Sequence, residues 1–200
     1  MIRLILTYAT FELDVGFLLF KKEYLNDQVW LTSFYIHVFS SVLCLAAGLT
    51  QFSKTILKYK PQLHRTIGRV YVFNILIINF PTAMIMAFYA DGLIPTKAAF
   101  VILDSMWFYF TLRAFLEIKK GNVDVHRRFM IRSFALTFSA VTLRGWNVIL
   151  STYTQLDALS IYMIDGWLGF VPNLVISELY IRLEKSVSSS SKFNLREKNH

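Results

Sequence analysis

Two His-Arg pairs at the edges of long apolar segments are the residues best suited to chemistry in this sequence. His64 and Arg65 precede one apolar run, and His126 and Arg127 precede another, which begins near Arg132. Neutral imidazole is a common ligand of haem iron, and guanidinium binds carboxylates such as haem propionates. The pattern therefore predicts a haem b site formed by His64, His126, Arg65, Arg127 and Arg132. Two alternatives stay open: a metal or quinone-headgroup site, and interfacial arginines that only hold lipid phosphates.

A second group of ionisable residues lies within the apolar runs, where charged side chains are costly and usually functional. His37, Asp104 and Arg144 each lie about six or seven residues from the same side of the membrane, and a rise of about 1.5 Å per residue places them at one depth. We expect an ion pair between Asp104 and Arg144 with His37 beside it. This arrangement predicts a ligand or proton site, and a purely structural ion pair is the alternative.

Motifs for nucleophilic or metal-dependent catalysis are absent from the sequence. It contains no HExxH, CxxC or GxSxG spacing and no phosphate-binding glycine loop, and Cys44 is the single cysteine. We therefore name no catalytic residue and expect no metal-ion site. Whether the protein is an enzyme stays open at this point.

Long apolar runs must position these residues. The apolar fraction is 55% and the aromatic fraction 16%, which is unusual for a soluble domain. A helix of about 20 apolar residues crosses a membrane. The sequence predicts an all-α, polytopic transmembrane bundle with about five spans, at residues 30–52, 70–90, 98–118, 130–151 and 161–181.

The loops between the predicted spans differ sharply in basic charge. Lys and Arg collect at 53–69 and 119–129, whereas the loop between spans four and five has neither. Basic loops stay on the cytoplasmic side. We therefore expect a multi-pass protein of the cell membrane, in a bacterium the inner membrane, with a cytoplasmic C-terminus. The net charge of +8 then reflects topology and attraction to anionic lipid headgroups, and no nucleic-acid partner is expected.

Three regions are expected along the chain. Residues 1–28 form an interfacial or truncated N-terminal segment, because Glu12 and Asp14 interrupt its apolar run. Residues 29–183 form the helical bundle. Residues 184–200, rich in serine and basic residues, are predicted to be a disordered tail on the membrane surface.

Other polar residues within the runs predict contacts between helices. A stripe at helical spacing comprises His37, Ser41, Cys44, Gly48 and Gln51. Glu178 is expected to pair with Arg113 or Arg132. Pro81 and Pro172 predict irregular backbone, because each removes an amide hydrogen from its helix.

Several stretches resemble a known family of bacterial membrane proteins. They are FYIHVFSSVLCLAAGLTQF, LHRTIGRVYV, HRRFMIRSFALTFSAVTLRGW and WLGFVPNL, and the family is catalogued as domain of unknown function 2306. The resemblance covers about residues 30–183. It implies a membrane bundle and motif positions at His37, His64, Arg65, Arg69, His126, Arg127, Arg132 and Arg144. It implies no activity.

Three functions compete at this stage. The first hypothesis is a b-type haem-binding redox membrane protein that uses His64 and His126. The alternative is a small-solute or proton-coupled transporter, or ligand-binding bundle, that uses His37, Asp104 and Arg144. The third is a structural membrane subunit without catalysis. The sequence does not determine the oligomeric state.

Overall fold

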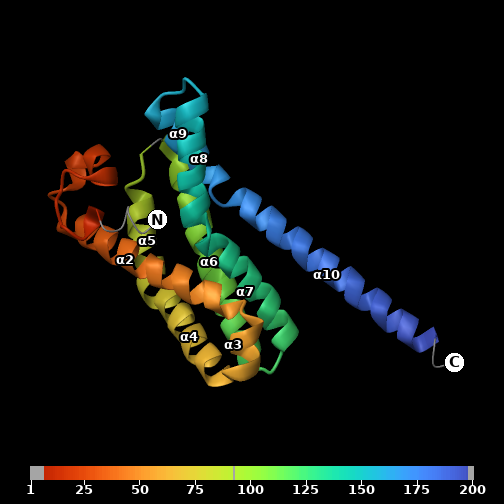
Figure 1. The fold of residues 1–200 in the computed structure, drawn as a ribbon. Helices are drawn as coiled ribbons and strands as arrows, with labels where there is room; N and C mark the ends of the chain where they lie inside the picture. The colour runs from red at the N-terminus through yellow and green to blue at the C-terminus, as the bar shows by residue number, and fades with distance from the viewer. Residues whose placement is uncertain (1–6, 92, 198–200) are drawn as a thin grey trace.

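The computed structural model describes residues 7–91 and 93–197, and regular structure in this part of the chain is helical throughout (Figure 1). The π-helical segment η3 joins α4 to α5, and α2, α4, α6 and α7 pack around one apolar core. The elements are η1 (Gly16–Phe20), η2 (Lys22–Tyr24), α2 (Gln28–Gln51), α3 (Lys54–Tyr59), α4 (Pro61–Phe73), η3 (Asn74–Asn79), α5 (Phe80–Phe88), α6 (Leu93–Lys119), α7 (Val123–Thr137), α8 (Ser139–Tyr153), α9 (Ala158–Leu168) and α10 (Val171–Glu197).

Four helical segments of the described chain are long and apolar enough to cross a membrane. They are Gln28–Gln51, Pro61–Phe88, Leu93–Lys119 and Ala158–Ser186, and the second combines α4, η3 and α5. This result confirms the predicted all-α membrane bundle. It differs from the five expected spans at residues 130–151, where the chain forms two shorter helices, α7 and α8, that run nearly end to end (Figure 1).

The break between α7 and α8 falls at Phe138. Just before it, Thr137 Oγ1 donates to Ser133 O at 3.1 Å, and hydroxyls that bond to carbonyls of the preceding turn bend helices. Each part has 15 residues, fewer than the roughly 20 needed to cross a membrane. Only the two helices together have the length that the apolar run suggested.

Pro81 and Pro172, the two prolines singled out in the sequence analysis, lie where the helix is irregular, as predicted. Pro81 is the second residue of α5, just beyond η3, and Pro172 is the second residue of α10. Backbone groups freed by a proline must find protein partners in a membrane. Beside Pro172, Asn173 Nδ2 donates to Gly169 O at 3.2 Å and to Ala135 O at 3.1 Å. The side chain of Asn173 therefore supports the backbone at this point.

The N-terminal segment folds against one end of α2. Tyr8 and Leu18 are buried there with Trp30 and Phe34 of α2. Lys21 is 1% exposed, forms an ion pair with Asp91 at 2.7 Å and donates to the carbonyl of Tyr89 at 2.6 Å. These contacts fasten the described part of residues 1–28 to the α5–α6 connection.

Asp27 closes the first turn of α2 as its N-cap. Its Oδ1 accepts from Val29 N at 2.9 Å and Trp30 N at 3.1 Å, and its Oδ2 accepts from Tyr89 Oη at 2.8 Å. The backbone amide of Trp30, and then the Tyr89 hydroxyl, hold the pKa of this carboxyl below its ordinary value of 3.8. A lowered folded-state pKa stabilises the fold above the ordinary value, and this stabilisation is lost as pH falls through the lowered pKa.

We therefore expect Asp27→Ala to lower the thermal midpoint at neutral pH. The difference from the wild type should shrink as pH falls below about 3.8. Thermal unfolding in detergent, repeated from neutral pH to below about 3.8, measures this difference in thermal midpoint, with Glu12→Ala as the control. A difference that stays constant with pH would contradict the assigned cap.

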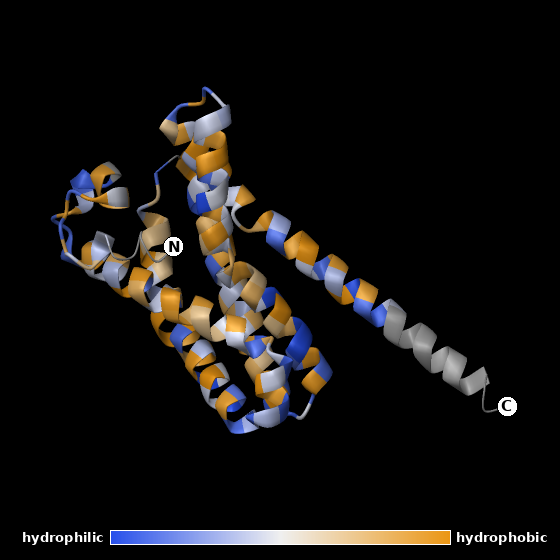
Figure 2. Ribbon diagram, in the orientation of Figure 1, coloured by the Kyte–Doolittle hydropathy of each residue, from blue (hydrophilic) through white to orange (hydrophobic). Residues whose placement is uncertain are grey.

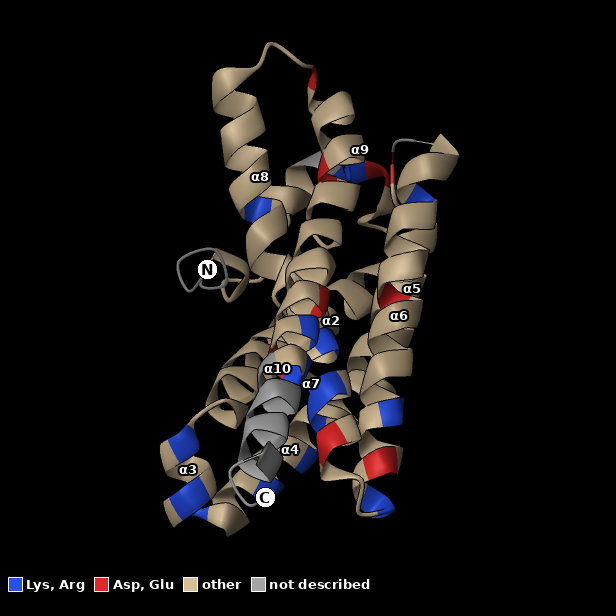
Figure 3. Ribbon diagram, turned by 90° about the vertical axis from the view of Figure 1, so that its right-hand side faces the viewer, with Lys and Arg blue, Asp and Glu red and all other residues tan. Residues whose placement is uncertain are grey.

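Basic residues gather at one end of the bundle, called the basic end below. It comprises residues 54–69, in α3 and the first turns of α4, and residues 119–128, at the α6–α7 turn. Figure 2 shows hydrophilic residues collected there, and Figure 3 shows Lys and Arg on the same elements. The two basic loops of the sequence are therefore neighbours in space.

The last helix, α10, begins at Val171. The helix extends through Glu197, and the disorder predicted for residues 184–200 stays a prediction. No glycine or proline follows Pro172, so the sequence of α10 contains no residue that would break the helix. Figure 1 shows α10 leaving the bundle at an angle.

Candidate functional site

His64 and His126 stand on helices that face each other across the basic end. His64 lies in α4 and His126 in α7, and both helices pack against α2 and α6. The two imidazole rings lie within electrostatic range of each other. The structure therefore places both histidines at the same end of the bundle, on helices that share α2 and α6 as neighbours.

A hydrogen bond further along the same helices fixes this arrangement. Tyr71 Oη lies 3.0 Å from Ser133 Oγ. Tyr71 follows His64 by seven residues, and Ser133 follows His126 by seven residues. Seven residues are about two helical turns, so each histidine shares a face with its successor. The bonded faces of α4 and α7 are thus the faces that carry the histidines.

Each imidazole has a nitrogen available to a ligand. His126 Nδ1 lies 2.8 Å from Ala114 O. A carbonyl only accepts, so Nδ1 carries the hydrogen and Nε2 keeps its lone pair. His64 Nδ1 is buried and has no hydrogen-bond partner among the described residues. A backbone carbonyl on the remote nitrogen is the usual support of a metal-binding histidine.

The arginines of this region divide into two kinds. Arg127 pairs with Glu184, and Arg132 pairs with Glu178, whose Oε2 lies 3.0 Å from Arg132 Nη2. Glu178 therefore pairs with one of its two predicted partners, and both ion pairs fasten α10 to α7. Carboxylates of α10 therefore already engage two of the arginines predicted for the haem site, Arg127 and Arg132. Arg65 is exposed and has no ion pair within the described chain.

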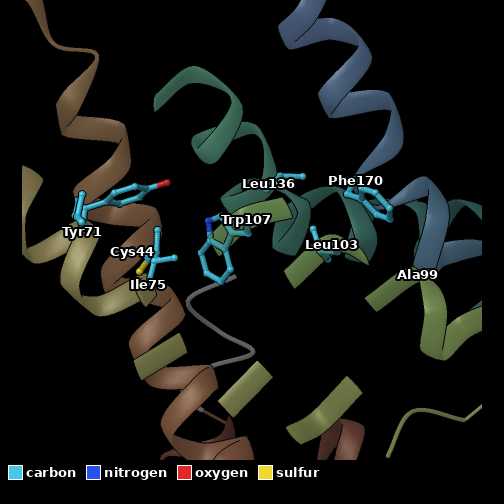
Figure 4. Packing of buried hydrophobic residues seen from close by; sticks show 10 residues of the cluster. Cys44, Tyr71, Ile75, Ala99, Leu103, Trp107, Leu136 and Phe170 are labelled. Atoms are coloured by element: carbon cyan, nitrogen blue, oxygen red, sulfur yellow. The ribbon is translucent and has the colours of Figure 1, made fainter. Parts of the chain in front are cut away.

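A buried polar network continues from Tyr71 and Ser133 into the bundle. Tyr71 Oη also lies 2.7 Å from Thr137 Oγ1, which accepts from Trp107 Nε1 at 3.0 Å. Thr111 Oγ1 lies 2.7 Å from Ser133 Oγ. In Figure 4 the hydroxyl of Tyr71 points to the side on which Trp107 lies. The network joins α4, α6 and α7 and holds the histidine faces in register.

The α2 stripe forms a second chain of hydrogen bonds. Ser41 Oγ donates to Asn79 Oδ1 at 2.8 Å and lies 3.3 Å from His37 Nε2. Asn79 Nδ2 then donates to Asn74 Oδ1 at 3.1 Å and to Cys44 Sγ at 3.4 Å. The π-helical segment thus presents its two asparagines to α2. This result agrees with the predicted helix contact along the stripe.

The predicted ion pair between Asp104 and Arg144 is wrong. His37 and Arg144 lie within electrostatic range, but no salt bridge between described residues includes Asp104 or Arg144. Arg144 Nη1 donates instead to the carbonyl of Ala140 in its own helix. The reason is geometric: α8 packs mainly on α9, and Asp104 lies on α6. Equal depth in the membrane does not bring two helix faces together.

Asp104 is therefore a buried carboxyl without a hydrogen-bond or ion-pair partner in the part of the chain described. It is 6% exposed. Burial without a partner is costly, so we expect Asp104→Leu to increase the free energy of unfolding by about 1–3 kcal/mol. Chemical unfolding in mixed micelles measures this, with Asp165→Leu as the comparison. A loss of stability in Asp104→Leu would show that the carboxyl has a partner.

Asp165 is a residue that sequence reasoning missed. It is 1% exposed, its Oδ2 accepts from Asn147 Nδ2 at 2.7 Å, and its Oδ1 is buried without a partner among described groups. The sequence does contain a signal for Asp165, because a carboxylate within predicted span five is costly and needs a partner. Its contact with Asn147 joins α9 to α8, and Asp165→Leu is expected to destabilise because it breaks this contact.

The helical architecture and the buried ionisable groups define a polytopic membrane protein. A family model described as "Predicted membrane protein (DUF2306)" matches residues 34–181, and the chain belongs to this family. The resemblance carried by the His-Arg stretches is thereby confirmed. No curated protein and no solved structure matches the chain.

Proposed function

We propose that this membrane protein binds haem b between His64 and His126 at the basic end and carries electrons within the membrane. The observation that carries the proposal is the bond between Tyr71 and Ser133, which joins the helix faces that carry His64 and His126. Haem needs only two protein ligands, because the porphyrin supplies the other four nitrogens. The proposed site therefore needs no third histidine or carboxylate.

The surroundings of the histidines suit such a cofactor. The carbonyl of Ala114 orients the His126 ring with Nε2 toward the site. Arg65 is free to bind a propionate, as a guanidinium does with carboxylates. If His64 and His126 both held the iron, the haem would be suited to electron transfer more than to oxygen binding.

We further propose that the basic end faces the cytoplasm. Its Lys and Arg residues follow the rule that short basic loops stay inside, and they would lie against anionic lipid headgroups. The haem site would then lie near the inner membrane surface, and the C-terminus of α10 would be cytoplasmic.

The experiment is an absorption spectrum of the full chain, purified in mild detergent from cells supplied with a haem precursor. The dithionite-reduced minus air-oxidised difference should show a b-type haem, extractable as unmodified protohaem because Cys44 provides no CxxCH attachment. A flat difference spectrum from folded protein would overturn the proposal.

A further inference from the structure

A groove lies between α2 and the α4–η3 segment, which pack against each other (Figure 1). Its volume is about 470 Å³, within the range of about 300–1,000 Å³ that small-molecule sites occupy. Both walls belong to helical segments that are long and apolar enough to cross a membrane. The apolar side chains that line the groove are all exposed on the outside of the bundle: Leu43, Val70, Phe73, Ile77 and Ile78. The groove therefore opens toward lipid.

The two polar residues that line the groove are buried and already hydrogen-bonded within the protein. Asn74 Nδ2 donates to Ser40 O at 3.0 Å, which ties the two walls together. Ser40 Oγ donates to Ile36 O at 2.6 Å, within α2. A polar group placed in the groove would lose its water without gaining these partners, which is costly. A hydrocarbon chain is therefore the occupant that the groove suits.

The π-helical turn of η3 shapes one wall of the groove. Asn79 Nδ2 donates to Asn74 Oδ1 at 3.1 Å, although the two residues are five apart in the sequence. A π-helical turn is wider than an α-helical one, so both asparagines lie on the side of α2. Ile77 and Ile78, between them, stay on the exposed side. The wall that faces lipid is thus apolar despite the two asparagines.

The groove begins next to the basic end of the bundle. Arg69 directly precedes Val70 in α4, is exposed, and forms no ion pair within the described chain. Side chains of a helix lean toward its N-terminus, so this guanidinium extends toward the basic end. From Val70 to Ile78, eight helical steps cover about 12 Å, which is most of one leaflet of a hydrocarbon core about 30 Å thick.

We propose that this groove binds one acyl chain of an anionic phospholipid, whose phosphate binds to Arg69. A guanidinium matches two oxygens of a phosphate group. The net negative charge of the lipid complements the Lys and Arg residues of the basic end. A zwitterionic lipid brings the same chain, but its choline cation would face these basic residues. The site lies on the outside of the bundle and does not depend on haem.

The test is native mass spectrometry of the delipidated full chain, titrated in a neutral detergent with phosphatidylglycerol and separately with phosphatidylcholine. We expect phosphatidylglycerol to bind more tightly. Arg69→Gln should weaken its binding about fivefold, the effect of one basic residue near an anionic surface. The matched control Arg128→Gln removes the same side chain from the other basic segment and should keep the preference. Equal affinities of the two lipids, or an unchanged preference in Arg69→Gln, would overturn the proposal.

Ile77→Trp tests the part of the site that holds the chain. The larger side chain should fill the groove and weaken the binding of both lipids. Ile176→Trp is the matched control, because Ile176 lies on α10, outside the groove, and both isoleucines are 65% exposed. Equal effects of the two substitutions would contradict a site in the groove.

Photolabelling of the wild-type chain locates the lipid without any substitution. Phosphatidylglycerol that carries a diazirine in its acyl chain should label Leu43 and Ile77, as mapped by mass spectrometry of peptides. Unlabelled phosphatidylglycerol should compete better than phosphatidylcholine. Labelling that is equally strong at Ile176, on the exposed face of α10, would show only a non-specific belt of lipid and would overturn the proposal.

Discussion

His126→Ala is expected to remove the haem spectrum of this protein. The substitution deletes one of the two imidazoles that would bracket the iron and leaves the carbonyl of Ala114 without its donor. Loss of a partner in the second coordination shell alone lowers metal affinity about 10–100-fold, so loss of a direct ligand should exceed that range. Haem content per chain, measured as the pyridine haemochrome after purification, should fall accordingly. His64→Ala should have the same effect.

A matched control is available in the same bundle. His37 lies on α2 in the opposite half, bonded to Ser41. His37→Ala should keep its haem, because this imidazole takes no part in the site. Full haem occupancy in His126→Ala, or equal loss in His37→Ala, would contradict the assignment.

Trp107→Ala is expected to cause the largest loss of stability among substitutions in the core. The side chain is 6% exposed, lies in the main apolar cluster and donates to Thr137 Oγ1 at 3.0 Å. The loss should be about 3 kcal/mol, at the lower end of the range for a large aromatic in a core. The lower end applies because lipid solvates apolar surface almost as well as protein does.

The comparison variant is Tyr109→Ala. Tyr109 lies on the same helix but is 51% exposed, so its removal should cost far less. Reversible unfolding in mixed micelles, followed by helical circular dichroism, gives both values. Equal losses in the two variants would show that α6 is rotated relative to the structure described.

The positions of most spanning helices were predictable because the length of an apolar run and the charge of a loop depend only on consecutive residues. The runs around residues 30–52 and 70–90 appear as α2 and the α4–η3–α5 segment. The pairing of Glu178 with Arg132 was also foreseeable, since each is a costly charge that needs an opposite one at similar depth. The break at Phe138 was not, because it depends on hydroxyl groups that a hydropathy average does not detect.

The candidate residues could be named from the sequence, but their arrangement could not. Depth along a helix follows from residue number, but the direction in which a side chain points depends on how the helices are rotated and packed. His64 and His126 therefore lie on helix faces joined by a hydrogen bond, whereas Asp104 and Arg144 form no ion pair. The burial of Lys21 could not be predicted either, because its partner Asp91 lies far away in the sequence.

The most direct test of the central claim is the near-infrared magnetic circular dichroism of the oxidised full chain. This measurement identifies the axial ligands of a ferric haem through its charge-transfer band. The facing arrangement of His64 and His126 predicts a low-spin haem with two imidazole ligands. A high-spin or histidine–methionine signal, or no haem signal from folded protein, would contradict it.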